Sequence, residues 1–85
     1  MERGRTWLAD GNISLARLFF ERAADLGIAD AALAMGETFD AIELARRGVI
    51  GIKPDSAAAR HWYEKARALG AGAAAQRRLE RLGAR

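Results

Sequence analysis

A twelve-residue pattern occurs twice in this 85-residue chain, and the second copy lies 43 positions after the first. Each copy has an aromatic pair at its centre, Phe19-Phe20 in the first and Trp62-Tyr63 in the second, and each ends in leucine-glycine. The apolar residues of each copy recur at intervals of three and four, which is the period of an amphipathic helix. A helical unit repeated at this distance predicts stacked helix pairs, because one unit cannot bury its apolar face alone.

Capping residues predict where these helices begin and end. Gly27 and Gly70 each follow a helical stripe, and glycine enters the left-handed region without the steric cost of a Cβ. Pro54-Asp55 precedes the second copy, and both residue types are typical of a helix start. An alanine-rich segment follows each glycine. The pattern therefore predicts five helices and no sheet, near residues 3–10, 13–26, 29–41, 55–69 and 72–83.

The segment 41–54 is predicted to connect two helices. Two alternatives stay open for Ile42, Leu44 and Ala45, since they could extend the preceding helix or form an extra turn. The remainder contains two glycines and a β-branched run, which is typical of a loop. Val49, Ile50 and Ile52 are too apolar to be wholly solvated, so we expect some of them to lie between helices.

Large rings are scarce, which makes each of them important for the core. The chain has three Phe, two Trp and one Tyr, while alanine supplies much of its 51% hydrophobic content. Alanine adds little buried area, so the rings carry a large share of the packing. From the repeat we predict that Phe19 and Trp62 are among the most buried side chains.

Together these features resemble the Sel1-like repeat, a relative of the tetratricopeptide repeat. The resemblance covers nearly the whole chain, but the connector is longer than usual and Arg67 replaces an alanine. The last helix also lacks the expected glycine and aromatic residue near Glu80 and Gly83. The matching residues are Ala29, Ala31, Met35, Gly36, Phe39, Gly48, Val49, Asp55, Ala59, Trp62, Tyr63, Ala66 and Gly70, with an earlier copy at Ala16, Phe19, Phe20, Ala23, Ala24 and Gly27.

The resemblance implies an all-α fold, an α-solenoid of antiparallel helix pairs with about two repeats plus a terminal helix. It divides a single domain over 1–85 into a partial repeat helix (1–12), the second helix of a first repeat (13–27), a full repeat (28–70) and a terminal capping helix (71–85). Gly4 and Trp7 have the spacing of Gly36 and Phe39, so the chain is expected to begin partway through a repeat, as an excerpt of a longer protein.

The resemblance also implies a non-catalytic module for protein–protein interaction or scaffolding, of bacterial type, with no catalytic residue and no cofactor. The expected partner is a protein or peptide segment. In a helical solenoid the first helix of each pair lines the concave surface, where extended or helical ligands bind. The predicted partner-binding residues share one face of that helix, with Leu33 as its apolar centre. They are Asp30, Leu33, Ala34 and Glu37.

The alternative function is a nucleic-acid-binding accessory domain that uses the basic C-terminal helix. Clustered arginines can follow phosphates. The formal charge of only +3 and the lack of interleaved aromatic residues argue against it, and cations are also common near a helix C-terminus. The arginines concerned are Arg77, Arg78, Arg81 and Arg85.

Metal sites, thiol chemistry and membrane insertion find little support in the sequence. The chain has no cysteine and a single histidine, His61, which the repeat places at a surface position. No apolar stretch is long enough to span a membrane, and the first residues lack the apolar core of a secretory leader. The absence of cysteine favours a reducing compartment such as the cytoplasm.

Overall fold

The computed structural model describes residues 13–49 and 51–83, and within these ranges it contains helices and no strand. The predicted helix near 3–10 lies outside the described residues. The other four predicted helices are present, and one short helix, α4, is additional. The helices are α2 (Ile13–Asp25), α3 (Ala29–Glu37), α4 (Ala41–Arg46), α5 (Ser56–Leu69) and α6 (Gly72–Gly83).

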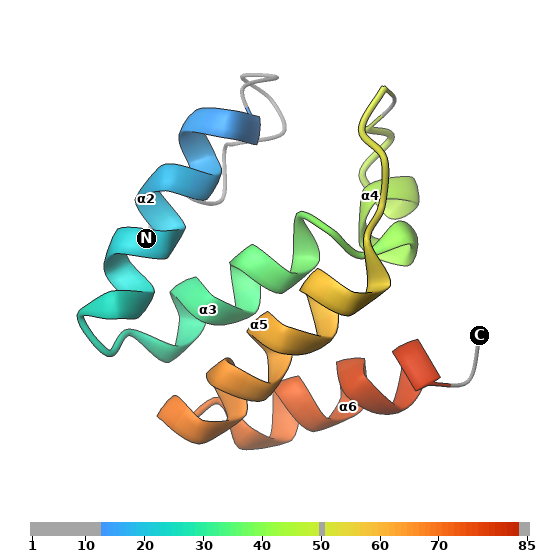
Figure 1. Ribbon diagram of the computed structural model, residues 1–85. Coiled ribbons are helices and arrows are strands. Elements are labelled where there is room, and N and C mark those ends of the chain that lie inside the picture. The colour runs from blue at the N-terminus through green and yellow to red at the C-terminus, as the bar shows by residue number, and fades with distance from the viewer. Residues whose placement is uncertain (1–12, 50, 84–85) are drawn as a thin grey trace.

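Four of the helices pack in a row. The closest contacts are between successive helices, in the order α2, α3, α5 and α6 (Figure 1). Alternate helices also meet, since Lys65 of α5 pairs with Asp25 of α2 and Arg78 of α6 pairs with Glu37 of α3. Tight turns join α2 to α3 and α5 to α6, so these neighbours run antiparallel. The short α4 stands beside the loop that leads into α5 (Figure 1). Each helix of the row therefore buries one face against the helix next to it.

Helix α3 ends at Glu37, earlier than the predicted end near residue 41, and α4 begins after a break. The break has a local cause. The side chain of Asp40 accepts a hydrogen bond from the backbone N of Ile42 at 3.0 Å, and so caps a new helix. A short polar side chain that bonds to the nearby backbone favours such a restart over continuation. Of the two alternatives for this segment, the extra turn is correct.

Gly27 and Gly70 end their helices in the same way, as predicted. Their φ angles are 89° and 121°, in the region that favours glycine. The residue after each glycine donates a backbone hydrogen bond five residues back, from Ile28 to Ala23 at 3.1 Å and from Ala71 to Ala66 at 3.0 Å. Two equivalent C-terminal caps therefore lie 43 residues apart, which supports the internal repeat.

The prediction for the two most buried rings is wrong. The core contains Phe20 and Tyr63, which are 1% and 0% exposed, whereas Phe19 is 44% exposed and Trp62 is partly buried. Adjacent helix residues point about 100° apart, so both members of an aromatic pair can sit at the edge of one apolar stripe. Only the position of the neighbouring helices decides which ring faces the core.

Small residues let the helices approach closely. Ala31, Ala32 and Ala66 are fully buried where α3 and α5 meet. Beside them, a Cβ added to Gly36 would overlap the ring of Tyr63. The partly buried Val49 and Ile52 of the connector pack against the cluster around Phe20, as expected for apolar loop residues, whereas Ile50 lies outside the described residues.

Candidate functional site

The most polar buried region of the described chain contains three carboxylates at intervals of three residues. Glu37 ends α3, Asp40 caps α4, and Glu43 lies within α4, so a single stretch of chain supplies all three. Their exposed fractions are 7%, 0% and 1%. Buried carboxylates are costly unless they are paired, so their partners decide what this region can do.

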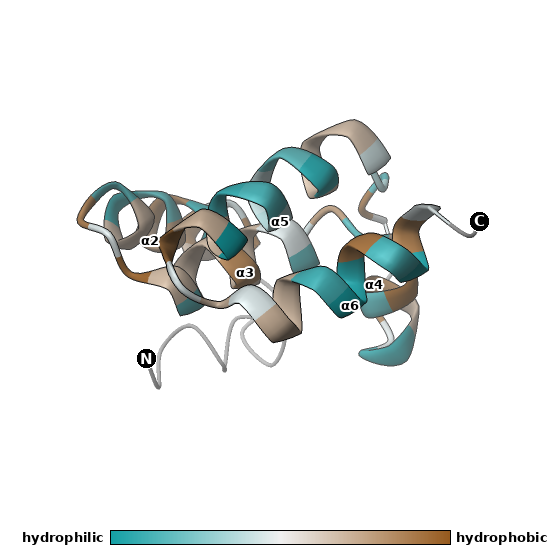
Figure 2. Ribbon diagram, turned by 90° about the horizontal axis from the view of Figure 1, so that it is seen from below, coloured by the Kyte–Doolittle hydropathy of each residue, from teal (hydrophilic) through white to brown (hydrophobic). Residues whose placement is uncertain are grey.

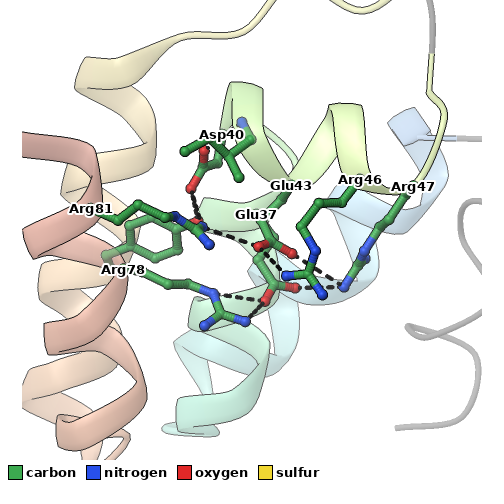
Figure 3. A network of polar contacts seen from close by, with 9 residues as sticks. Glu37, Asp40, Glu43, Arg46, Arg47, Arg78 and Arg81 are labelled. Carbon is green, nitrogen blue, oxygen red and sulfur yellow. Dashed lines mark hydrogen bonds and ion pairs between the residues drawn. The ribbon is translucent and has the colours of Figure 1, made fainter. Parts of the chain in front are cut away.

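Four arginines from two helices face these carboxylates (Figure 3). From α6, Arg78 donates through Nε to Glu37 at 3.0 Å, and Arg81 donates through Nη2 to both Asp40 and Glu43, at 3.0 and 3.1 Å. At the C-terminal end of α4, two further arginines approach from the other side. Arg46 contacts Glu43 at 3.0 Å and Arg47 contacts Glu37 at 3.2 Å. We call these seven residues the acid–arginine cluster.

Tyr63 of α5 joins the acid–arginine cluster through its hydroxyl group, which donates to Oδ2 of Asp40 at 2.6 Å. Burial raises the pKa of Tyr63 well above its ordinary value, and the hydrogen bond to Asp40 adds to the rise. Partial burial alone would lower the pKa of Arg81, but its hydrogen bonds to Asp40 and Glu43 outweigh this, so the pKa is raised. The tyrosine therefore stays neutral and the guanidinium stays charged.

This geometry suits a structural connection better than catalysis. A general acid or base needs a carboxyl group that can reach a substrate, and here each of the three carboxylates contacts at least one arginine. Within residues 13–49 and 51–83, no group of three or more acidic, histidine or cysteine side chains could hold a metal ion. The acid–arginine cluster instead ties α6 to the end of α3 and to α4, through residues that sequence reasoning did not pair.

The four residues predicted to bind a partner differ in their exposure to solvent. Asp30 is exposed, but Leu33 and Ala34 are partly buried and pack against the hydrophobic clusters. Glu37 is a member of the acid–arginine cluster and is not the free flanking charge that we expected. A partner-binding role for this face stays a prediction, and Asp30 is its accessible member.

Another surface carries the exposed large apolar side chains of the described chain. All of them lie on α2 or in the turn that follows it, and the ribbon between α2 and α3 is coloured mostly as hydrophobic (Figure 2). The repeat placed Leu26 on the buried stripe, yet it is 82% exposed. These residues are Leu15, Leu18, Phe19, Leu26 and Ile28, with exposed fractions of 48%, 53%, 44%, 82% and 43%.

The arginines considered for nucleic-acid binding do not form one free patch in the described part of the chain. Arg78 and Arg81 contact carboxylates, Arg77 is exposed, and Arg85 lies outside the described residues. His61 is exposed, as expected, and its ring meets that of Trp62 edge to face at 5.3 Å. No helix among the described residues is long and apolar enough to cross a membrane.

A row of antiparallel helices, with small residues at the contacts and a glycine cap repeated along the chain, defines an α-solenoid of the tetratricopeptide type. The family model described as Sel1 repeat matches residues 2–28 and 29–70. The chain therefore belongs to the Sel1 repeat family. No curated protein and no solved structure matches it. Sel1 repeats generally mediate protein–protein interaction, and the family is typically non-enzymatic.

Proposed function

We propose that this chain is a non-catalytic module that binds another protein and helps to assemble a complex. The observation that carries the proposal is the concentration of exposed large apolar side chains on α2 and its C-terminal turn. Exposed apolar residues gathered on one element are typical of an interaction surface, whereas single ones scattered over a protein need no explanation. Membership of the Sel1 repeat family supports the same function.

Nucleic-acid binding is the weaker candidate, because the arginines that would serve it are engaged within the protein. Phosphate binding through Arg78 or Arg81 would compete with their contacts to Glu37, Asp40 and Glu43. A phosphate would have to displace a buried carboxylate from each arginine, and each of the three carboxylates would then lose an ion pair in a buried position. We therefore do not assign this activity to α6.

Affinity capture tests the proposed function. The tagged full chain is immobilised and incubated with a lysate of the source organism, and a protein retained reproducibly is then purified and titrated against the chain. We expect direct, saturable binding that nuclease treatment does not change. Loss of all binding after nuclease treatment, with a steep salt dependence, would instead support the nucleic-acid alternative.

A charge reversal tests the predicted face of α3 in the same assay. Asp30→Lys changes the exposed member of that face, and Glu80→Lys is a matched reversal at an exposed position of α6. If the partner binds the α3 face, Asp30→Lys weakens binding several-fold and Glu80→Lys does not. Equal binding by both variants would exclude Asp30 and leave the interaction function to another surface.

A further inference from the structure

The internal repeat gives each exposed residue of α2 an equivalent in α5. Phe19, Arg22 and Leu26, spaced by three and four, form one face of α2, which we call the α2 stripe. The equivalent positions 43 residues later are Trp62, Lys65 and Leu69. The two sets have the same chemistry, namely an aromatic ring, a cation and a leucine, but they differ in burial.

The α5 set is partly buried, and the structure identifies what covers it. Trp62 packs against the cluster that Ile13, Ala16 and Phe20 of α2 form with Met35 of α3 and Leu44 of α4. Trp62 and Leu69 also pack against the alanine cluster to which Ala24 of α2 belongs, together with alanines of α3.

A charge pair completes this contact. Nζ of Lys65 lies 3.4 Å from Oδ1 of Asp25, the last residue of α2, and 5.2 Å from the centre of the Trp62 ring. The cover of the α5 set therefore includes a helix with small and apolar residues on one face and a carboxylate at its C-terminal end.

The α2 stripe has the same kinds of residue, but none of the described residues covers it in this way. Phe19 is 44% exposed and Leu26 is 82% exposed, while Trp62 and Leu69 are partly buried. Arg22 is exposed, and none of the described residues forms an ion pair with it. An aromatic ring, a leucine and an unpaired cation on one helix face are suited to a partner that supplies apolar contact and one negative charge.

We propose that the α2 stripe binds a helix of another polypeptide whose contact face consists of small and apolar residues and whose C-terminal turn carries a carboxylate, in the way that α2 contacts the equivalent face of α5. Phe19 and Leu26 pack against the apolar face of that helix, and Arg22 pairs with its carboxylate. The inference deepens the proposed interaction function and rests on it, since it names the surface and the chemistry of the partner.

A second copy of the same chain does not offer such a face at its other end. Helix α3 packs on α5 through Ala32, Leu33 and Gly36. Between α3 and α6 the repeat distance is 44 residues, since the fully buried Ala31 and Ala75 are equivalent. At this distance the equivalents of Ala32, Leu33 and Gly36 are the exposed and polar Gln76, Arg77 and Glu80 of α6. End-to-end stacking of copies would set this polar face against the α2 stripe, so a different polypeptide is the better occupant.

The probe for the test is a peptide of residues 13–28, which is the chain's own example of such a helix. It is stapled between positions 14 and 18, which are exposed in α2, because a helix of this length is marginal alone. Glutamine replaces Leu15, Phe19 and Leu26 in the peptide, so that only the face of Ile13, Ala16, Phe20 and Ala24 can bind. Binding to the isotope-labelled full chain is followed by nuclear magnetic resonance.

We expect saturable binding, with shift changes at Phe19, Arg22 and Leu26. Phe19→Gln should weaken it about tenfold, as for the central aromatic residue of an interface. Arg22→Asp should weaken it several-fold, and a peptide with Asp25→Arg should restore binding to that variant. Leu18→Gln is the matched control, because Leu18 is 53% exposed on the same helix and its equivalent in α5, His61, is exposed and is no part of the contact with α2.

Absence of binding by the stapled peptide, equal binding by the Phe19→Gln variant, or failure of the charge swap to restore binding would overturn the proposal. So would sedimentation of the chain as a dimer that Phe19→Gln dissociates, because the occupant would then be a second copy. Retention of a captured protein partner by the Phe19→Gln variant would reject this surface while the interaction function stands, which separates the two proposals.

Discussion

Tyr63 places its apolar ring and its polar hydroxyl group in two different environments. Its ring fills the space left by Gly36, and its hydroxyl group reaches Asp40 at 2.6 Å. The ring needs an apolar environment and the hydroxyl group needs a partner, so the residue can occupy only the boundary between the core and the acid–arginine cluster. Phenylalanine, which has no hydroxyl group that needs a partner, stands at the equivalent position 20 and is 1% exposed.

Alkaline titration tests this environment, since Tyr63 is the single tyrosine of the chain. Burial raises its pKa above the ordinary 10.0, so folding favours the neutral form. The resulting stability is fully present below pH 10.0 and is lost as the pH rises through the higher folded-state pKa. We expect the ultraviolet absorbance of tyrosinate to appear only with the loss of helical circular dichroism. Ionisation near pH 10.0 in a chain that is still folded would contradict the burial.

At the scale of elements, helix α6 is held by two kinds of contact. Ala75 and Leu82 are buried among residues of the hydrophobic clusters, and Arg78 and Arg81 reach the carboxylates of α3 and α4. The apolar contacts give most of the free energy, because buried ion pairs have to recover the cost of desolvating both charges. The ion pairs fix the position of α6 along its own axis, since the guanidinium groups meet the carboxylates at only one such position.

Replacing one arginine of this contact should destabilise the fold. Arg81→Met removes the hydrogen bonds to Asp40 and Glu43, and we expect it to lower the free energy of unfolding by about 1–3 kcal/mol. The remaining partners of both carboxylates limit the loss. Urea denaturation followed by circular dichroism measures the change. The control Arg77→Met alters an exposed arginine of the same helix and should stay within about 0.5 kcal/mol, so equal losses would argue against a role for the ion pairs.

For the whole molecule, Trp62 is the residue that connects separate parts of the core. It packs against both the cluster around Phe20 and the alanine cluster, so it joins the first repeat to the second. A short solenoid depends on such contacts between neighbouring repeats, because each unit is too small to be stable alone. The equivalent Phe19 makes no comparable connection, as its exposure of 44% indicates.

The same substitution at these two equivalent positions tests the difference. We expect Trp62→Ala to lower the free energy of unfolding by about 3 kcal/mol, at the lower end of the range for tryptophan because the ring is only partly buried. Phe19→Ala should cost less than about 1 kcal/mol. Thermal and urea unfolding of both variants measure this. Similar losses would mean that Phe19 is covered in solution.

The sequence alone determined the limits of most of the helices, because these depend on residues close together in the chain. The period of the apolar residues, the glycines at 27 and 70 and the acid at 55 predicted α2, α5 and α6 to within one or two residues. The same pattern determined the family, through residues that the Sel1 repeat model also matches. The sequence did not decide whether a new helix begins at Asp40, since the apolar residues of 41–45 fit either a longer helix or a separate one.

Only the tertiary structure decided which ring faces the core and which acid is buried. Phe19 and Phe20 fit the helical period equally well, and the position of α3 and α5 selects Phe20. We predicted that Glu37 is a surface charge, because its partner Arg78 lies 41 residues away in the chain. Contacts between residues far apart in the chain leave no local pattern, since their energy depends on where the helices meet. The packing of α3 and α4 against α6 therefore turns three ordinary acidic residues into a buried cluster, and the packing of α2 on α3 leaves Phe19 and Leu26 exposed.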